Sequence, residues 1–95
     1  MRDLPQSHHR SKNYREVIGI VTRGLYDNDG RLFFDVLTEE KIENKIVKTP
    51  HVIQVGKGSA YAVRRIKEGD KIWIEGSHSA FGTLILRDFI NFNWA

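Results

Sequence analysis

The 95-residue chain is long enough for one small domain, and its content of 40% hydrophobic and 11% aromatic residues is typical of a folded protein. It has no cysteine, which excludes a disulfide framework and a thiolate zinc site. The formal net charge of +3 is compatible with a polyanionic partner but does not require one. No apolar stretch approaches the roughly 18 residues that span a bilayer, and the polar N-terminus lacks the apolar core of a signal peptide. We therefore expect a cytoplasmic protein without membrane association.

The chain divides into a polar N-terminal segment and a globular remainder. Residues 1–13 contain one proline and a His-His pair and lack hydrophobic periodicity. We interpret them as a flexible arm. Residues 14–95 carry the alternating apolar patterns and form the predicted domain.

The domain begins with a β-rich run over residues 14–25. Gly19 and Gly24 lie inside this run, where a strand bends or bulges as at the corners of small barrels. The Asp29-Gly30 pair that follows is a strong signal for a tight turn. The first strand is therefore expected to be strongly bent and to lead into a hairpin.

Residues 31–37 alternate between two faces, as a half-buried strand does. The charged stretch 38–45 is predicted to be a hairpin loop, and residues 46–55 a third strand. The better core face of the second strand carries Leu32, Phe34 and Val36, and the opposite face carries Phe33, Asp35 and Leu37.

A short helix and two further strands complete the pattern. Residues 59–67 predict a helix of about two turns, with Gly69 placed to end it. Residues 71–76 alternate so that Trp73 faces outward, and residues 83–92 form the last strand. The order β-β-β-α-β-β predicts an all-β, five-stranded OB-fold barrel with one short helix between strands three and four.

Three blocks resemble the bacterial single-stranded DNA-binding protein (SSB) family. Residues 55–62 read Val-Gly-Lys-Gly-Ser-Ala-Tyr-Ala, and residues 66–76 read Ile-Lys-Glu-Gly-Asp-Lys-Ile-Trp-Ile-Glu-Gly. Residues 88–92, Asp-Phe-Ile-Asn-Phe, are similar to the last strand of that family, and residues 14–21 resemble its first strand more loosely. The resemblance implies an OB fold and sequence-tolerant binding of single-stranded DNA in replication or recombination, close to the nucleoid.

The chain also departs from that family. The acidic, Phe-terminated tail that recruits replication and repair enzymes is not present after Asn93-Trp94-Ala95, and Val55 precedes the Gly-Lys pair. Several base-stacking aromatics of the family are missing. The sequence therefore resembles a tail-less variant more closely, of the primosomal replication protein B type or of a phage, plasmid or mobile element.

Non-specific binding of a single strand needs flat aromatic surfaces for the bases. Trp73 is the first candidate, with packing against an oligomer partner as the alternative. Phe33 and Phe89 lie opposite predicted core residues, Phe34 for the first and Ile90 and Phe92 for the second. Each of the two is therefore expected on a ligand face or a protein interface. Tyr26 and Phe81 fall in the loops that OB folds commonly use for ligands.

The same binding needs cations that follow the phosphates. Arg87 is a candidate because it is expected to share a face with Phe89, and Lys71 is a candidate because it lies beside Trp73. The remaining candidates for phosphate contacts are Arg15, Arg23, Arg31, Lys48 and Lys57.

The sequence does not contain the motifs of the enzyme classes that some of its residues suggest. Gly56-Lys57-Gly58-Ser59 lacks the glycine and Ser/Thr spacing of a phosphate-binding loop. The four histidines show no metal-ligand spacing, and Ser77-His78-Ser79 is not a triad. We expect no catalytic residue, metal or cofactor.

Several partners fit these features. The expected ligand is single-stranded DNA, with RNA as an alternative because OB folds bind either nucleic acid. The exposed aromatics also fit a homodimer or homotetramer, formed through a sheet edge. An OB subunit that docks a polymerase, helicase or primase is the second alternative.

Overall fold

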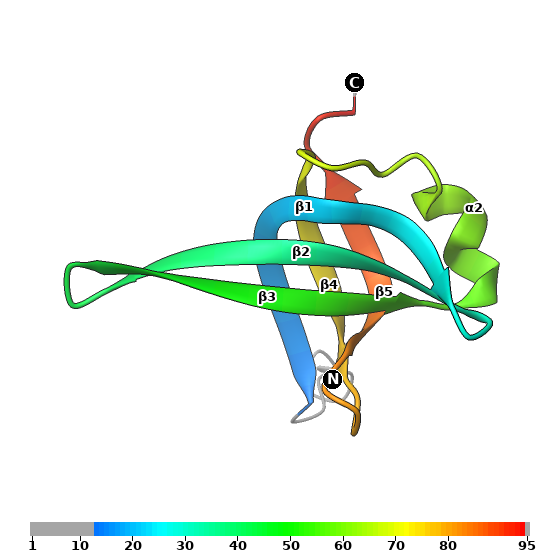
Figure 1. Ribbon diagram of the computed structural model, residues 1–95, viewed down its shortest axis with the longest axis horizontal. Helices are drawn as coiled ribbons and strands as arrows, with labels where there is room; N and C mark the ends of the chain where they lie inside the picture. The colour runs from blue at the N-terminus through cyan, green and yellow to red at the C-terminus, as the bar shows by residue number, and fades with distance from the viewer. Residues whose placement is uncertain (1–12, 95) are drawn as a thin grey trace, which may run out of the picture.

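The computed structural model describes residues 13–94. Residues 1–12 of the predicted flexible arm therefore lie outside the described residues. Within the described part, the strands and the helix follow the predicted order (Figure 1). Their bounds are β1 Tyr14–Asn28, β2 Arg31–Ile42, β3 Lys45–Val55, the 3₁₀ turn η1 Lys57–Ser59, α2 Ala60–Val63, β4 Lys71–His78 and β5 Leu84–Asn91.

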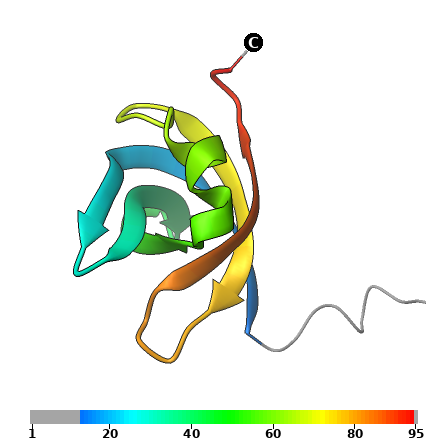
Figure 2. The ribbon, with the colours of Figure 1, turned by 90° about the vertical axis from the view of Figure 1, so that its right-hand side faces the viewer.

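The strands close into a barrel in the order β1-β2-β3-β5-β4. Neighbouring strands are antiparallel except for β3 and β5, which pair in parallel over a short stretch and complete the circle. Helix α2 lies across the end of the barrel that faces the viewer in Figure 2. The predicted five-stranded OB-fold barrel, with one short helix between strands three and four, is confirmed.

The core fills the barrel with aliphatic side chains around one phenylalanine. Phe34 and Val36 are fully buried, as the alternation of the second strand predicted. Val63 and Ile66, at and just after α2, are buried in the same cluster, which explains how so short a helix is held in place. The other core residues are Val21, Ile53, Val55, Ile72, Ile74, Leu84 and Leu86.

One buried carboxylate connects the helix–β4 loop to the sheet. Asp70, only 2% exposed, accepts hydrogen bonds from Asn91 Nδ2 at 2.9 Å and from the backbone N–H of Lys67 at 3.1 Å. The Asn91 bond lowers the pKa of Asp70 against the opposing effect of burial. The same loop is hydrogen-bonded to β1, where Val21 N–H donates to the Asp70 carbonyl at 2.8 Å.

Two glycines allow strands to approach each other closely. A Cβ atom on Gly19 would lie 2.5 Å from the Leu37 carbonyl oxygen, and one on Gly76 would lie 2.3 Å from the Ile85 carbonyl oxygen. Both distances are too short for any side chain. Beyond Gly19, register shifts in the pairing of β1 with β2 after Val21 and again after Arg23 bend β1 around the barrel, as the sequence suggested.

The predicted loop over residues 38–45 is wrong. β2 and β3 remain paired up to Ile42 and Lys45, so that a long two-stranded hairpin projects from the barrel (Figure 1). Glu43 and Asn44 form its turn with φ of 51° and 65°. Positive φ at both central residues matches the type I′ hairpin turn, but Glu-Asn is a weak signal for it compared with Asn-Gly. The composition of residues 38–45 resembles that of a loop because both faces of this hairpin are exposed to solvent and therefore carry charged side chains.

The predicted face of Phe89 is also wrong. The pairing of β4 with β5 shifts between Glu75 and Gly76, so Arg87 and Asp88 are both exposed at a bulge. The alternation is inverted after the bulge. Phe89 therefore packs against the core, whereas Ile90, expected inside, is 53% exposed. Phe92, also expected inside, is exposed, and Arg87 does not share a face with Phe89.

Candidate nucleic-acid interface

An aromatic pair lies on the outer side of β1 and β2. Tyr26 and Phe33 are directly opposite each other in the pairing of these strands, with ring centroids 5.7 Å apart and planes tilted by 30°. Both rings are partly exposed. β2 also pairs with β3, where Gln54 lies directly opposite Phe33 and extends the same outer face.

A cation lies over one ring of this pair. The Arg23 guanidinium carbon lies 3.7 Å from the centroid of the Tyr26 ring, within the range of a cation–π contact. The Tyr26 hydroxyl donates a hydrogen bond to Asp35 Oδ1 at 2.8 Å. Burial, followed by the hydrogen bond and negative charge of Asp35, raises the pKa of Tyr26, so its hydroxyl stays a neutral donor. These contacts hold the ring in one orientation.

Two further predicted cations lie at the end of this surface. Arg31 is exposed directly after the β1–β2 turn, and Leu32 next to it pairs with Val55 at the end of β3. Lys57, exposed in η1, follows Val55 by two positions. We call this surface the aromatic face: Arg23, Tyr26 and Phe33, with Arg31 and Lys57 at its end.

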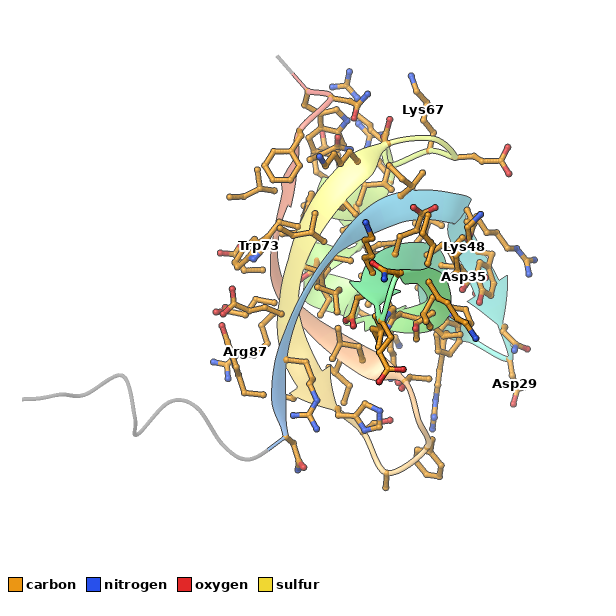
Figure 3. The ribbon with its side chains drawn as sticks, turned by 90° about the vertical axis from the view of Figure 1, so that its left-hand side faces the viewer. Asp29, Asp35, Lys48, Lys67, Trp73 and Arg87 are labelled. Atoms are coloured by element: carbon orange, nitrogen blue, oxygen red, sulfur yellow. The ribbon has the colours of Figure 1, made fainter. Side chains whose placement is uncertain are left out.

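Trp73 lies elsewhere, on the outer side of the β1–β4–β5 sheet. It is opposite Ile18 on β1 and Ile90 on β5, and the indole N–H donates to Glu16 Oε1 at 3.1 Å. Figure 3 shows Trp73 and Arg87 projecting from one side of the barrel, away from Asp35 and Lys48. We call the apolar line formed by Ile18, Trp73 and Ile90 the Trp73 row.

The residues on either side of the Trp73 row differ in charge. Glu16, Glu75 and Asp88 are paired across the three strands and form an acidic row on one side. On the other side Lys71 lies opposite Ile20, and the backbone of Phe92 donates to the Lys71 carbonyl at 2.9 Å. An apolar row beside three carboxylates is a poor surface for a polyanion, despite Lys71 and Arg87.

The remaining predicted residues belong to neither surface. Lys48 lies on the projecting hairpin, 3.7 Å from Glu39 in an exposed ion pair. Phe81 is 84% exposed in the loop between β4 and β5. Arg15, at the start of β1, donates to the Tyr14 carbonyl at 2.7 Å and lines a cavity next to that loop.

The sequence reading missed two features. His51 and His78, which show no metal-ligand spacing in the sequence, line the same cavity as Arg15. Tyr61, on α2, is exposed with the Arg64 guanidinium carbon 4.2 Å from its ring centroid. A histidine in a strand gives no signal in a single sequence, because its partner is brought to it only by folding.

Residues 13–94 contain no group of three or more His, Asp or Glu side chains placed to hold a metal ion. In the same residues, no helix is long and apolar enough to cross a membrane.

Known protein-family models do not match this chain, and neither do curated protein sequences. Solved structures do. A Plasmodium falciparum SSB, solved with single-stranded DNA, aligns with a TM-score of 0.68 at 20% identity over 88% of this chain and 97% of its own. A small single-stranded DNA-binding protein from Mycoplasma pneumoniae aligns with a TM-score of 0.68 at 14% identity over 90% and 92%. The mitochondrial protein Rim1 of Saccharomyces cerevisiae aligns with a TM-score of 0.67 at 10% identity over 83% and 92%.

These alignments cover nearly the whole of each neighbour, so the likeness is between complete barrels. At identities of 20% and below they show that this chain shares the OB fold found in single-stranded DNA-binding proteins. What the chain binds has to be argued from its own surface.

Proposed function

We propose that this chain is a sequence-tolerant single-stranded DNA-binding protein of replication or recombination, without catalytic activity, that acts with DNA in the cytoplasm. The observation that carries the proposal is the aromatic face, where Arg23 lies 3.7 Å above Tyr26 and Tyr26 packs against Phe33 at 5.7 Å. The shared fold with single-stranded DNA-binding proteins supports it.

The aromatic face has the two properties that such binding needs. The rings of Tyr26 and Phe33 offer π surfaces to bases of any identity, which makes the interaction tolerant of sequence. Arg23, Arg31 and Lys57 provide positive charge for the phosphates beside those rings. Gln54 is the neighbouring polar side chain on the same face.

Binding of a fluorescently labelled dT oligomer, followed by anisotropy, tests the function. We expect measurable affinity at about 50 mM salt, and a slope of log K against log salt near −3 if about four phosphates are neutralised. The same length of rU in parallel tests whether RNA is preferred. Folded protein that binds neither oligomer under these conditions would show that the proposal is wrong.

The Trp73 row suggests a second copy of this chain as partner. The outer side of the β1–β4–β5 sheet carries the acidic row on one side of the Trp73 row and Lys71 on the other. A two-fold axis along the Trp73 row would place each Lys71 against the acidic row of the partner and would bury Ile18, Trp73 and Ile90. An axis along the strands would instead oppose like charges. We therefore propose self-association through this sheet face, in place of the sheet edge expected from the sequence.

Sedimentation of the wild-type protein and of an Ile90→Lys variant checks this interface. The wild type is expected to be a dimer or larger at about 50 μM, and the variant to be monomeric, because a lysine at position 90 replaces apolar contact area by a charge that burial would desolvate. Ile46→Lys, on the exposed hairpin, is the matched control and should leave the mass unchanged. A monomeric wild type contradicts self-association and would leave the row free for a different protein partner.

A further inference from the structure

A cavity opens between the start of β1, the middle of β3 and the loop that joins β4 to β5. Its volume is about 290 Å³, which is near the lower end for small-molecule sites and suits one small group. The walls are partly apolar. Residues that line it are Arg15, Val17, Thr49, Pro50, His51, Val52, His78, Gly82 and Leu84.

Three of these side chains carry or can acquire positive charge, and they come from different strands. Arg15 is on β1, His51 on β3 and His78 at the end of β4. Among the described residues that line the cavity there is no aspartate or glutamate. The sequence separates these side chains by more than twenty positions each, so only the closed barrel brings them together.

His51 is held in place from β2. Its Nε2 atom lies 3.2 Å from Thr38 Oγ1, within hydrogen-bond distance. The Thr38 hydroxyl donates its own proton to the Thr49 carbonyl at 3.2 Å. The ring therefore has a fixed position at the cavity wall. Burial, followed by the positive charge of nearby His78, lowers the pKa of His51, whereas Glu40 on β2 acts in the opposite direction.

Other charges face this region and have to be considered. An adjoining hollow, which His51 and Arg15 also line, includes Glu16 from β1 and Glu39 and Glu40 from β2. Glu39 is already paired with Lys48. Arg15 and His51 line both hollows, whereas His78, Gly82 and Leu84 line only the first, which no carboxylate of the described residues lines.

We propose that this cavity binds the phosphate group of a nucleotide, through Arg15 and the protonated side chains of His51 and His78, and that this makes strand binding dependent on pH. The inference rests on the proposed function, because the nucleotide is taken to be part of the bound strand. The apolar walls formed by Val17, Pro50, Val52 and Leu84 accept the sugar or base. Phe81, exposed in the adjoining loop, is next to Gly82 at the rim.

The sign of the pH effect follows from the charges. In the free protein His51 is largely neutral at pH 7, because its pKa is below the ordinary value of 6.5. A bound phosphate anion favours the protonated form of the His51 ring and raises its pKa. Affinity should therefore rise as the pH falls through the pKa of the complex, and should stop rising below the pKa of the free protein.

The direct test follows the histidine ring protons by NMR in the wild-type protein between pH 5 and 8, with signals assigned from His51→Gln and His78→Gln. Inorganic phosphate, dTMP and a dT oligomer without terminal phosphates are added separately. We expect the pKa of His51 to rise with dTMP and with the oligomer, and the ring signals of His78 to shift with both ligands. Inorganic phosphate shows whether the phosphate alone is sufficient, and the oligomer shows whether an internal phosphodiester can be the bound group.

Affinity for the same oligomer provides the second measurement, because its phosphodiesters do not titrate in this range. The wild type should bind about tenfold more tightly at pH 5.5 than at pH 7.5, the change that one unit of pKa shift produces. The double variant His51→Gln, His78→Gln should lose most of this dependence. The variant His8→Gln, His9→Gln is the matched control and should retain it.

The outcomes separate this inference from the proposed function. If the oligomer binds but no ligand changes the pKa of His51 or the ring signals of His78, the cavity inference is wrong and the function stands. If the oligomer fails to bind and dTMP still raises the pKa of His51 and shifts the ring signals of His78, the strand-binding function is wrong and the phosphate site stands.

Discussion

Replacing Tyr26 and Phe33 together by alanine is expected to weaken binding of a dT oligomer by about 100-fold, since each base stacked on an aromatic ring contributes roughly 1–3 kcal/mol. The two rings are in contact at 5.7 Å, and the double variant shows whether their contributions multiply, as expected for two separately stacked bases. Each single variant should still lose about tenfold. Titration of labelled oligomer at fixed salt and pH measures all three.

The control for this result is present in the same chain. Tyr61→Ala also removes an exposed tyrosine with an arginine guanidinium carbon 4.2 Å from its ring centroid, but this tyrosine is on α2 and is not one of the residues of the aromatic face. It should leave the affinity within about twofold, as expected for a ring that stacks on no base. If Tyr61→Ala weakens binding as much as Tyr26→Ala, the effect is general loss of aromatic surface. If Trp73→Ala alone abolishes binding, the strand lies on the β1–β4–β5 sheet.

Gly76→Ala is expected to be the most destabilising single substitution considered, lowering the free energy of unfolding by about 3 kcal/mol. The added Cβ would lie 2.3 Å from the Ile85 carbonyl oxygen, which is backbone and cannot turn aside. Relief requires β4 and β5 to separate next to the bulge that sets the register of β5. Thermal unfolding should show a fall in Tm of more than about 10 °C, at 4–8 °C per kcal/mol for a domain of this size.

Gly58→Ala is the matched control, because a Cβ there meets nothing within 4 Å. Its Tm should lie within a few degrees of the wild type, since replacing a glycine where alanine fits changes the free energy of unfolding by less than about 1 kcal/mol. A Gly76→Ala variant with the same Tm as Gly58→Ala would mean that β4 and β5 can move apart at little cost.

The barrel could be predicted because its signals are local. Alternation at Leu32, Phe34 and Val36 specified a core face, and the Asp29-Gly30 turn fixed the first hairpin. These patterns come from a period of two residues along a strand, which does not depend on what the strand packs against. The same reasoning failed at residues 38–45, where a hairpin exposed on both faces has the composition of a loop.

The sequence alone therefore determined the order of strands, the place of the helix and most of the core. It also supplied a candidate list of aromatics and cations, but it could not group them. The bulge at Arg87 and Asp88, which turns Phe89 inward and Ile90 outward, depends on how β5 pairs with β4. Only closure of the barrel separates the aromatic face from the Trp73 row.

The cavity lined by Arg15, His51 and His78 is the clearest case of a site that the sequence could not predict. Arg15, His51 and His78 come from three strands, and nothing near any of them in the sequence points to the others. Periodicity specifies which side of a strand a residue faces. Which strands become neighbours, and with what register, is decided by pairing over the whole chain, and that pairing is what assembles a site.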